Sequence, residues 1–237
     1  MTNPNYDCSR VVEIEDEPRH HLVIANEYVR AFAVEVGPHE RTLCHHHPND
    51  YLIYVASAAE IISAARDEEP KRLNYADGEC ELSRAGLTHV VENLGDQPFR
   101  NVVVELLAAA STLRRGLAPQ KISGDAEVRQ VFDDMRAAIF EIEVEPGAEL
   151  AVAGPAVVAS PYGNELTPDA LGDVEVKHNS ICDLAWIAAD REATLFGCWK
   201  QAVSLLVFRV GSTEANASIG SVLREPLKSL CAHAKEE

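Results

Sequence analysis

The sequence predicts an all-β protein built from two similar halves. Short, β-rich segments recur along the chain, and turn signals separate them roughly every ten residues. The pattern stops at 114–126 and then restarts. The 237 residues suit two domains of about 100–120 residues each. Many short, evenly spaced strands are typical of a sandwich, jelly roll or barrel.

The first half opens with an apolar segment at 11–14 and continues as a regular series. In residues 32–36, large apolar side chains alternate with Ala33 and Glu35 in the period-2 pattern of a half-buried strand, and Gly37-Pro38 ends this segment. Asp77-Gly78 is a strong hairpin signal between two later segments. The remaining expected strands of this half lie around 51–55, 61–62, 71–76, 79–82 and 102–107.

The second half repeats features of the first. Residues 135–146 resemble 29–38, since each is an alternating strand that ends in a proline-containing turn. Residues 202–210 correspond to 101–107, which indicates a duplicated domain with a period of roughly 105 residues. We therefore predict domains at 1–113 and 127–237, joined by a linker at 114–126, with a loop at 163–174. Helical spacing at the end predicts a short terminal helix containing Leu223, Leu227, Leu230 and Cys231, with Pro226 in its first turn.

Charge and composition exclude several classes of function. A formal net charge of −17 repels phosphate backbones and anionic lipid, so we expect no nucleic acid and no membrane partner. No apolar run approaches the ~20 residues of a membrane helix, and the N-terminus has no secretory pattern. We therefore expect a cytoplasmic protein.

The cysteines contain no CxxC pair. In a cytoplasmic chain of this size, free and mostly buried thiols are favoured over a disulfide framework or a zinc ribbon. The six residues are Cys8, Cys44, Cys80, Cys182, Cys198 and Cys231.

A histidine cluster follows Gly37. On a strand, His45 and His47 point to one face and His46 to the other. Two imidazoles on one face can share a metal ion at the ~2.0–2.1 Å that zinc–nitrogen bonds require. Alone the signal is weak, because clustered histidines are also common on surfaces.

A second stretch supplies another imidazole. Gly78 is followed by a strand-like segment, a bend at Gly86, His89 and then Asn93. A turn, a strand and a second bend would return His89 towards the cavity that His45 and His47 face.

With both stretches the sequence resembles the cupin superfamily. One cupin motif has a glycine, then H-x-H, then a glutamate after three or four intervening residues; the other has the form G-x5-P-x-G-x2-H-x3-N. The second is matched at every spacing, with Arg84 in place of the proline, while Gly37 lies two residues further upstream than usual. The match covers roughly residues 20–110, and strand pattern alone extends it to 127–210, as in two-domain bicupins. It implies two jelly-roll barrels, the first of them with a metal ion bound by His45, His47 and His89.

The expected glutamate is missing. Its place is taken by Tyr51 and Leu52, and Asp50 lies one residue short, where it would need a local bulge to turn inward. The resemblance then implies a three-histidine site, as in some cupin thiol and diketone dioxygenases. Such a site suits one divalent transition metal ion (Fe, Ni, Mn, Zn or Cu) and does not select among them. Tyr51 is a candidate hydrogen-bond donor behind the ligands, or simply part of the wall.

The second half lacks the corresponding histidines. Ala153 and Pro155 stand where His45 and His47 have their counterparts, and no histidine occurs between His178 and His233. We expect a degenerate barrel that stabilises the first or shapes its mouth. No special role is expected for the remaining histidines, and Glu92 and Glu105 are expected only as wall residues. The remaining histidines are His20, His21, His39, His178 and His233.

Two classes of function fit this sequence. One is a metal-dependent enzyme, dioxygenase- or isomerase-like, acting on a small molecule. The other is a barrel that stores or senses a small ligand without turnover, which the missing glutamate and the degenerate half fit equally well. A purely structural protein is harder to reconcile with His89. The resemblance also implies a homodimer, although two barrels clamped together as a monomer would leave few exposed edges.

Overall fold

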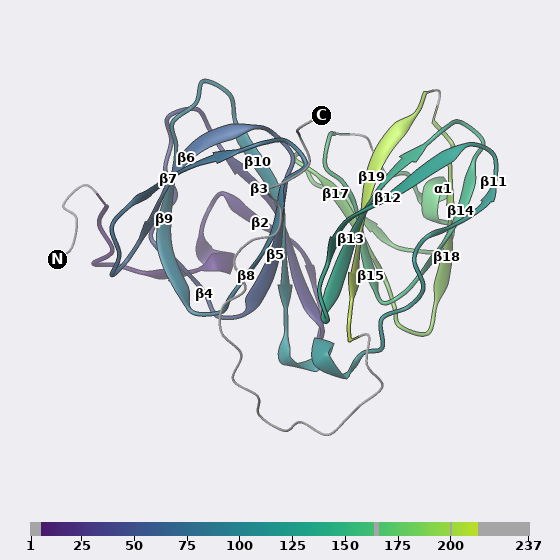
Figure 1. The fold of residues 1–237 in the computed structure, drawn as a ribbon, viewed down its shortest axis with the longest axis horizontal. Coiled ribbons are helices and arrows are strands. Elements are labelled where there is room, and N and C mark those ends of the chain that lie inside the picture. Colours follow the sequence, from purple (N-terminus) through teal and green to yellow (C-terminus); the bar gives the residue numbers. More distant parts are fainter. Residues whose placement is uncertain (1–5, 164–165, 200, 213–237) are drawn as a thin grey trace, which may run out of the picture.

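The fold is that of two β-barrels lying side by side (Figure 1). A computed structural model of the chain describes residues 6–163, 166–199 and 201–212. Strands dominate these residues, so the all-β prediction is confirmed. The terminal helix expected around 223–231 lies outside the described residues.

The first barrel consists of two five-stranded sheets. We call the first the outer sheet, with strand order β1-β4-β9-β6-β7, and the second the central sheet, with order β2-β3-β10-β5-β8. The outer-sheet strands are β1 (Val12–Glu13), β4 (His45–His47), β6 (Ala59–Ala65), β7 (Lys71–Tyr75) and β9 (Leu87–Asn93). Those of the central sheet are β2 (His20–Ala25), β3 (Val29–Val36), β5 (Asp50–Val55), β8 (Cys80–Ser83) and β10 (Phe99–Leu106). Two 3-10 helices, η1 (Ile14–Asp16) and η2 (Ala108–Thr112), flank these strands.

The second barrel has a three-stranded sheet, β11-β14-β18, and a six-stranded sheet, β12-β13-β19-β15-β17-β16. The smaller sheet contains β11 (Gln120–Ser123), β14 (Glu149–Ala153) and β18 (Glu192–Phe196). The larger one contains β12 (Ala126–Asp133), β13 (Ala137–Val144), β15 (Ala156–Ser160), β16 (Val176–Lys177), β17 (Asp183–Ile187) and β19 (Val203–Val210).

Two local expectations differ from the structure. The expected linker contains β11, whose four residues are all exposed, so it carries no apolar alternation that could reveal it. The expected loop at 163–174 contains the one-turn helix α1 (Pro168–Leu171). Pro168 at the start of α1 suits a first helical turn, because the missing amide hydrogen has no partner there in any case.

The internal repeat appears in the strand pairing. In the first barrel β3 and β10 are antiparallel over eight residue pairs, from Val29–Leu106 to Val36–Phe99. In the second, β13 and β19 pair in the same way, from Ala137–Val210 to Val144–Val203. These are the segments whose likeness suggested a duplication.

An apolar layer joins the barrels. One face of the central sheet packs against the larger sheet of the second barrel, and Tyr54, Ile139 and Phe208 there are almost completely buried. An ion pair between Asp50 and Arg136 also links the two halves. Figure 1 shows β5 and β13 side by side at this junction.

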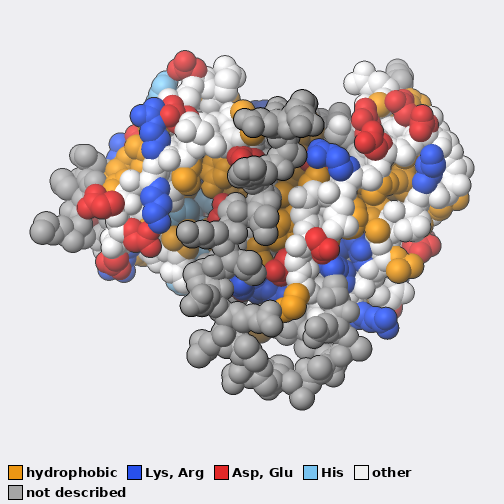
Figure 2. Space-filling model, in the orientation of Figure 1, with side chains coloured by type: hydrophobic (Ala, Val, Ile, Leu, Met, Phe, Trp, Pro, Cys, Tyr) orange, Lys and Arg blue, Asp and Glu red, His pale blue; other side chains and the backbone are white. Residues whose placement is uncertain are grey.

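The interiors of the two barrels differ in chemistry. The second is filled by apolar side chains, among them Phe140, Leu150 and Val207. The first holds buried histidines, beside which lies a cavity of about 390 Å³. On the face drawn in Figure 2, acidic and basic side chains are interspersed. Among the described residues, no helix is long and apolar enough to cross a bilayer.

The expectation of free cysteines is wrong for one pair. Cys8 and Cys44 form a disulfide, and both are buried. The chain places them together because β1 runs parallel to β4, with Val12 opposite His45, and the Val12 amide donates to the Cys44 carbonyl. Among the described residues, Cys80, Cys182 and Cys198 take part in no disulfide.

Candidate metal centre

The three histidines expected as ligands come together on the outer sheet. His45 and His47 lie on β4, and β9 runs antiparallel beside it with His89 directly opposite His45. All three side chains point into the first barrel and are buried, with exposed fractions of 0%, 2% and 7% respectively. Strand alternation and strand pairing therefore place these rings on one inner surface.

The spacing of His47 and His89 suits a shared ion. The Nε2 atoms of His47 and His89 are 3.3 Å apart. The ring centroid of His45 lies 5.0 Å from that of His47 and 4.7 Å from that of His89. Two nitrogens each bonded to one ion at about 2.1 Å, at angles between right and tetrahedral, are about 3.0–3.4 Å apart. The observed nitrogen separation falls within that interval.

Hydrogen bonds turn the ligand nitrogens inward. The Nδ1–H group of His45 donates to the Leu43 carbonyl at 3.0 Å, and Nδ1 of His89 lies 3.0 Å from the Ser63 hydroxyl. His45 therefore presents the lone pair of Nε2 to the interior. That atom is buried and has no hydrogen-bond partner among the described residues. An unpartnered acceptor facing other imidazoles fits a cation.

Burial also keeps these rings neutral. It lowers the pKa of His45 to about 3, with a further contribution from neighbouring His20. The pKa values of His47 and His89 are lowered as well, first by burial and then by the other imidazoles. Neutral imidazole is the form that binds a metal ion.

The structure corrects the expectation that His20 has no special role. It lies on β2 of the central sheet, is only 8% exposed, and its ring centroid is 4.6 Å from that of His45. Ring nitrogens of His20, His45 and His47 all lie within 4.8 Å of one another, a grouping able to hold a metal ion. His20 thus adds a fourth imidazole from the opposite sheet.

Of the two residues considered beside the ligands, only Tyr51 reaches the cluster. Its ring stacks on that of His47, with centroids 4.2 Å apart, and burial raises the pKa of its hydroxyl to about 12. Asp50 instead accepts a hydrogen bond from the Ala85 amide and pairs with Arg136. Because β5 pairs with β10 without a bulge, Asp50 stays on the face opposite to Tyr51.

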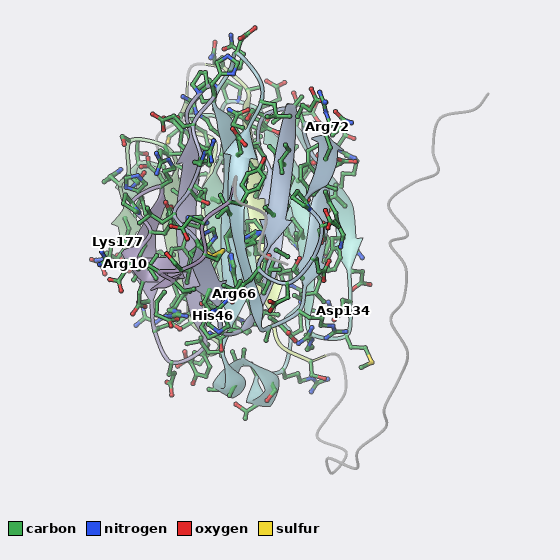
Figure 3. The ribbon with its side chains drawn as sticks, turned by 90° about the vertical axis from the view of Figure 1, so that its left-hand side faces the viewer. Arg10, His46, Arg66, Arg72, Asp134 and Lys177 are labelled. Carbon is green, nitrogen blue, oxygen red and sulfur yellow. A yellow bond between two sulfur atoms is a disulfide. The ribbon has the colours of Figure 1, made fainter. Side chains whose placement is uncertain are left out.

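Other candidates lie away from the cluster. His46 is on the opposite face of β4, beside the Thr88 hydroxyl, and Figure 3 shows it on the side of the outer sheet that faces the viewer. His178 is largely exposed. Glu92 bonds with Tyr6 and Glu105 pairs with Arg30, and neither lines the cavity.

The cavity extends from the histidines between the two sheets. Apolar side chains such as Val34, Ile61 and Val103 make up much of its wall. Asn101 on β10 is a polar exception, since its side-chain oxygen is buried without a hydrogen-bond donor among the described residues. The two carboxylates that line the cavity, Glu79 and Glu81, are half-buried and exposed respectively.

Comparisons with known proteins bear on the fold. No protein-family model and no curated protein sequence matches this chain. Among solved structures, AerE from Microcystis aeruginosa is similar with a TM-score of 0.52 at 13% identity, over 82% of this chain and 98% of that one. Vicilin from Solanum lycopersicum (tomato) has a TM-score of 0.54 at 12% identity, over 78% and 75%. A cupin domain from Bordetella pertussis aligns at 24% identity over 38% of this chain and 92% of its own, with a TM-score of 0.36.

Similarity at these identities concerns architecture and leaves the activity open. Two mainly antiparallel sheets face each other in each half, and the halves repeat the same central strand pairing. The chain has the cupin fold, with two double-stranded β-helix barrels in tandem.

Proposed function

We propose that the first barrel binds one divalent transition metal ion through His45, His47 and His89, and that a small molecule enters the cavity beside it. The observation that carries the proposal is the buried Nε2 atom of His45, which faces the other imidazoles and has no hydrogen-bond partner in the part of the chain that the structure describes. Leaving such an acceptor unsatisfied costs about 1–3 kcal/mol, a cost that a bound cation would remove.

The chain's own residues would hold and shield such a site. Leu43 fixes the ring of His45, Ser63 contacts that of His89, and Tyr51 covers one face of His47. Held by the neutral imidazoles of His45, His47 and His89, a divalent ion would keep its full 2+ charge and would supply Lewis-acid chemistry. The apolar wall excludes water around the body of the small molecule.

Metal content tests this proposal directly. The untagged protein should contain about one transition metal ion per chain, and His45→Ala and His89→Ala should contain almost none. His46→Ala is the matched control, because His46 lies on the same strand but on its other face, and it should retain the metal. A parent protein without metal after reconstitution, or a His45→Ala variant with full metal content, would contradict the proposal.

A metal-dependent reaction, dioxygenase- or isomerase-like, is the first use of such a site. Storage or sensing without turnover is the second, and one observation favours it. The cavity carboxylates lie towards solvent, and the pKa of Tyr51 is raised to about 12, so neither supplies an obvious buried base at neutral pH. Incubation of the metal-loaded protein with candidate compounds separates the two. An enzyme yields product that His89→Ala does not, whereas a binder gains thermal stability without product.

We further propose that the chain forms a homodimer. Val11, Leu22 and Leu43 are large apolar residues with exposed fractions of 36%, 41% and 47%. Val11 precedes the edge strand β1, Leu22 lies on the edge strand β2, and Leu43 lies just before β4. Light scattering should give about twice the chain mass, and Leu43→Lys should lower it. A mass equal to that of one chain would favour a monomer in which the two barrels pack against each other.

A further inference from the structure

His20 and Glu17 form a buried pair at the histidine cluster. Nδ1–H of His20 donates to Oε2 of Glu17 at 2.8 Å, and the Glu17 residue is 1% exposed. The carboxylate of Glu17 also accepts from the backbone amides of Arg19 at 2.8 Å and of Leu43 at 3.2 Å. Burial alone would raise the pKa of Glu17, but the hydrogen bonds from His20 and these amides lower it to about 2.

This pairing determines which nitrogen His20 presents to the cluster. In the neutral ring, donation from Nδ1–H to Glu17 places the lone pair on Nε2, as it does in His45. Lone pairs that converge at short range in a buried site repel one another unless a cation lies between them. His20 and His45 come from different sheets, so their approach is a product of the tertiary fold rather than of a local sequence pattern.

Glu17 also connects the ligand-bearing elements. It lies just after η1, orients His20 on β2, and binds the amide of Leu43, whose carbonyl orients His45. One carboxylate therefore acts on two of the imidazoles from behind. A carboxylate that accepts from a metal-bound imidazole raises the basicity of that ligand and fixes its orientation.

We infer that His20 is a fourth metal ligand and that Glu17 is its positioning residue, so that the centre has four imidazoles with a carboxylate directly behind one of them. The inference rests on the proposed metal site. Under it, a negative charge stabilises the centre through His20 without occupying a coordination position.

Metal affinity and a double-mutant cycle test the inference without any measurement of activity. Dissociation constants for Co²⁺ would be measured by competition with a chromophoric chelator in the full-length parent, His20→Ala, Glu17→Gln and the double variant. We expect each single variant to bind about 10–100-fold more weakly at unchanged stoichiometry. The double variant should lose less affinity than the sum of the two single losses, because Glu17 acts largely through His20. The visible spectrum of bound Co²⁺ should change in all three variants.

Two neighbouring variants control for general damage. His21→Ala alters the exposed neighbour on β2, and Asp16→Asn an exposed carboxylate in η1, so both should bind Co²⁺ like the parent. Parent-like affinity and spectrum in His20→Ala, with His45→Ala unable to bind, would overturn the inference and leave the proposed site standing. Additive losses in the double variant would instead assign Glu17 a structural role. A parent that binds no Co²⁺ would overturn both.

Discussion

Single residues in the first barrel show polarity that folding alone does not explain. Asn101 is 4% exposed and its side-chain oxygen receives no hydrogen bond from the described residues, although it lines the cavity. An unsatisfied buried amide destabilises a fold, whereas an apolar group of the same shape is neutral or stabilising there. Such a residue is typical of a binding site, where stability is lower than it could be.

This gives a prediction for Asn101→Leu. We expect the melting temperature of the variant to equal or exceed that of the parent, and the metal content to be unchanged. A melting temperature lowered by several degrees, measured by differential scanning calorimetry, would show that Asn101 has a structural partner. Asn93→Leu is a useful contrast: its side-chain amide donates to the carbonyls of Val36, Gly37 and Gln97, so it should destabilise.

The sequence predicted some residues of the candidate site and missed others. His45, His47 and His89 could be found because two are spaced for one strand face and the third belongs to a motif with several fixed spacings. His20 could not, because β2 has an irregular register between Leu22 and Ile24, which breaks the alternation that would assign its faces. Glu17 becomes informative only once its hydrogen bond to His20 is known.

At the scale of elements, the outer sheet depends on a parallel edge pairing. β1 has only two residues, and the Cys8–Cys44 disulfide fastens the segment before it to the residue preceding β4. Cys44 lies beside His45 in sequence, so the same cross-link steadies the strand that carries two of the candidate ligands. The pairing was not predictable, since six cysteines allow many combinations and the parallel contact of β1 with β4 is not local.

Removal of this disulfide should weaken both the fold and the metal site. A Cys8→Ala/Cys44→Ala double variant should lose about 2–4 kcal/mol of unfolding free energy, because the cross-link restricts the unfolded chain, and it should bind metal more weakly. Urea unfolding monitored by circular dichroism measures the first effect. Cys198→Ala removes an exposed thiol outside the pair and should be close to neutral. An unchanged midpoint in the double variant would show that the disulfide contributes little. Disulfides persist in oxidising compartments, so in a reducing cytoplasm the same residues would be thiols.

At the scale of the molecule, the two barrels share one apolar layer rather than a flexible contact. Residues from both halves, including Tyr54 and Phe208, are buried in it. The two-barrel architecture could be predicted from the sequence because strand alternation and the internal repeat are strong, extended signals. The manner of packing did not, because apolar residues on both faces of the central sheet give a nearly continuous apolar run that does not reveal which partner each face contacts.

The shared layer predicts cooperative unfolding of the two halves. Both tryptophans, Trp186 and Trp199, belong to the second barrel, while the candidate metal site belongs to the first. Loss of tryptophan signal and release of metal should therefore coincide in urea. Phe208→Ala should lower the unfolding free energy by about 3–5 kcal/mol and shift both signals together. A tryptophan transition well below the point of metal release would show that the barrels unfold independently.

We expect the first barrel to hold its metal ion through imidazole nitrogens, with no other protein ligand. X-ray absorption at the edge of the bound metal tests this expectation most directly, because the fine structure reports the atoms bonded to the ion. We predict nitrogen neighbours at about 2.1 Å with the outer-atom scattering of several imidazoles, and a reduced imidazole contribution in His89→Ala. A bound ion surrounded by sulfur, or by oxygen without imidazole, would contradict the account.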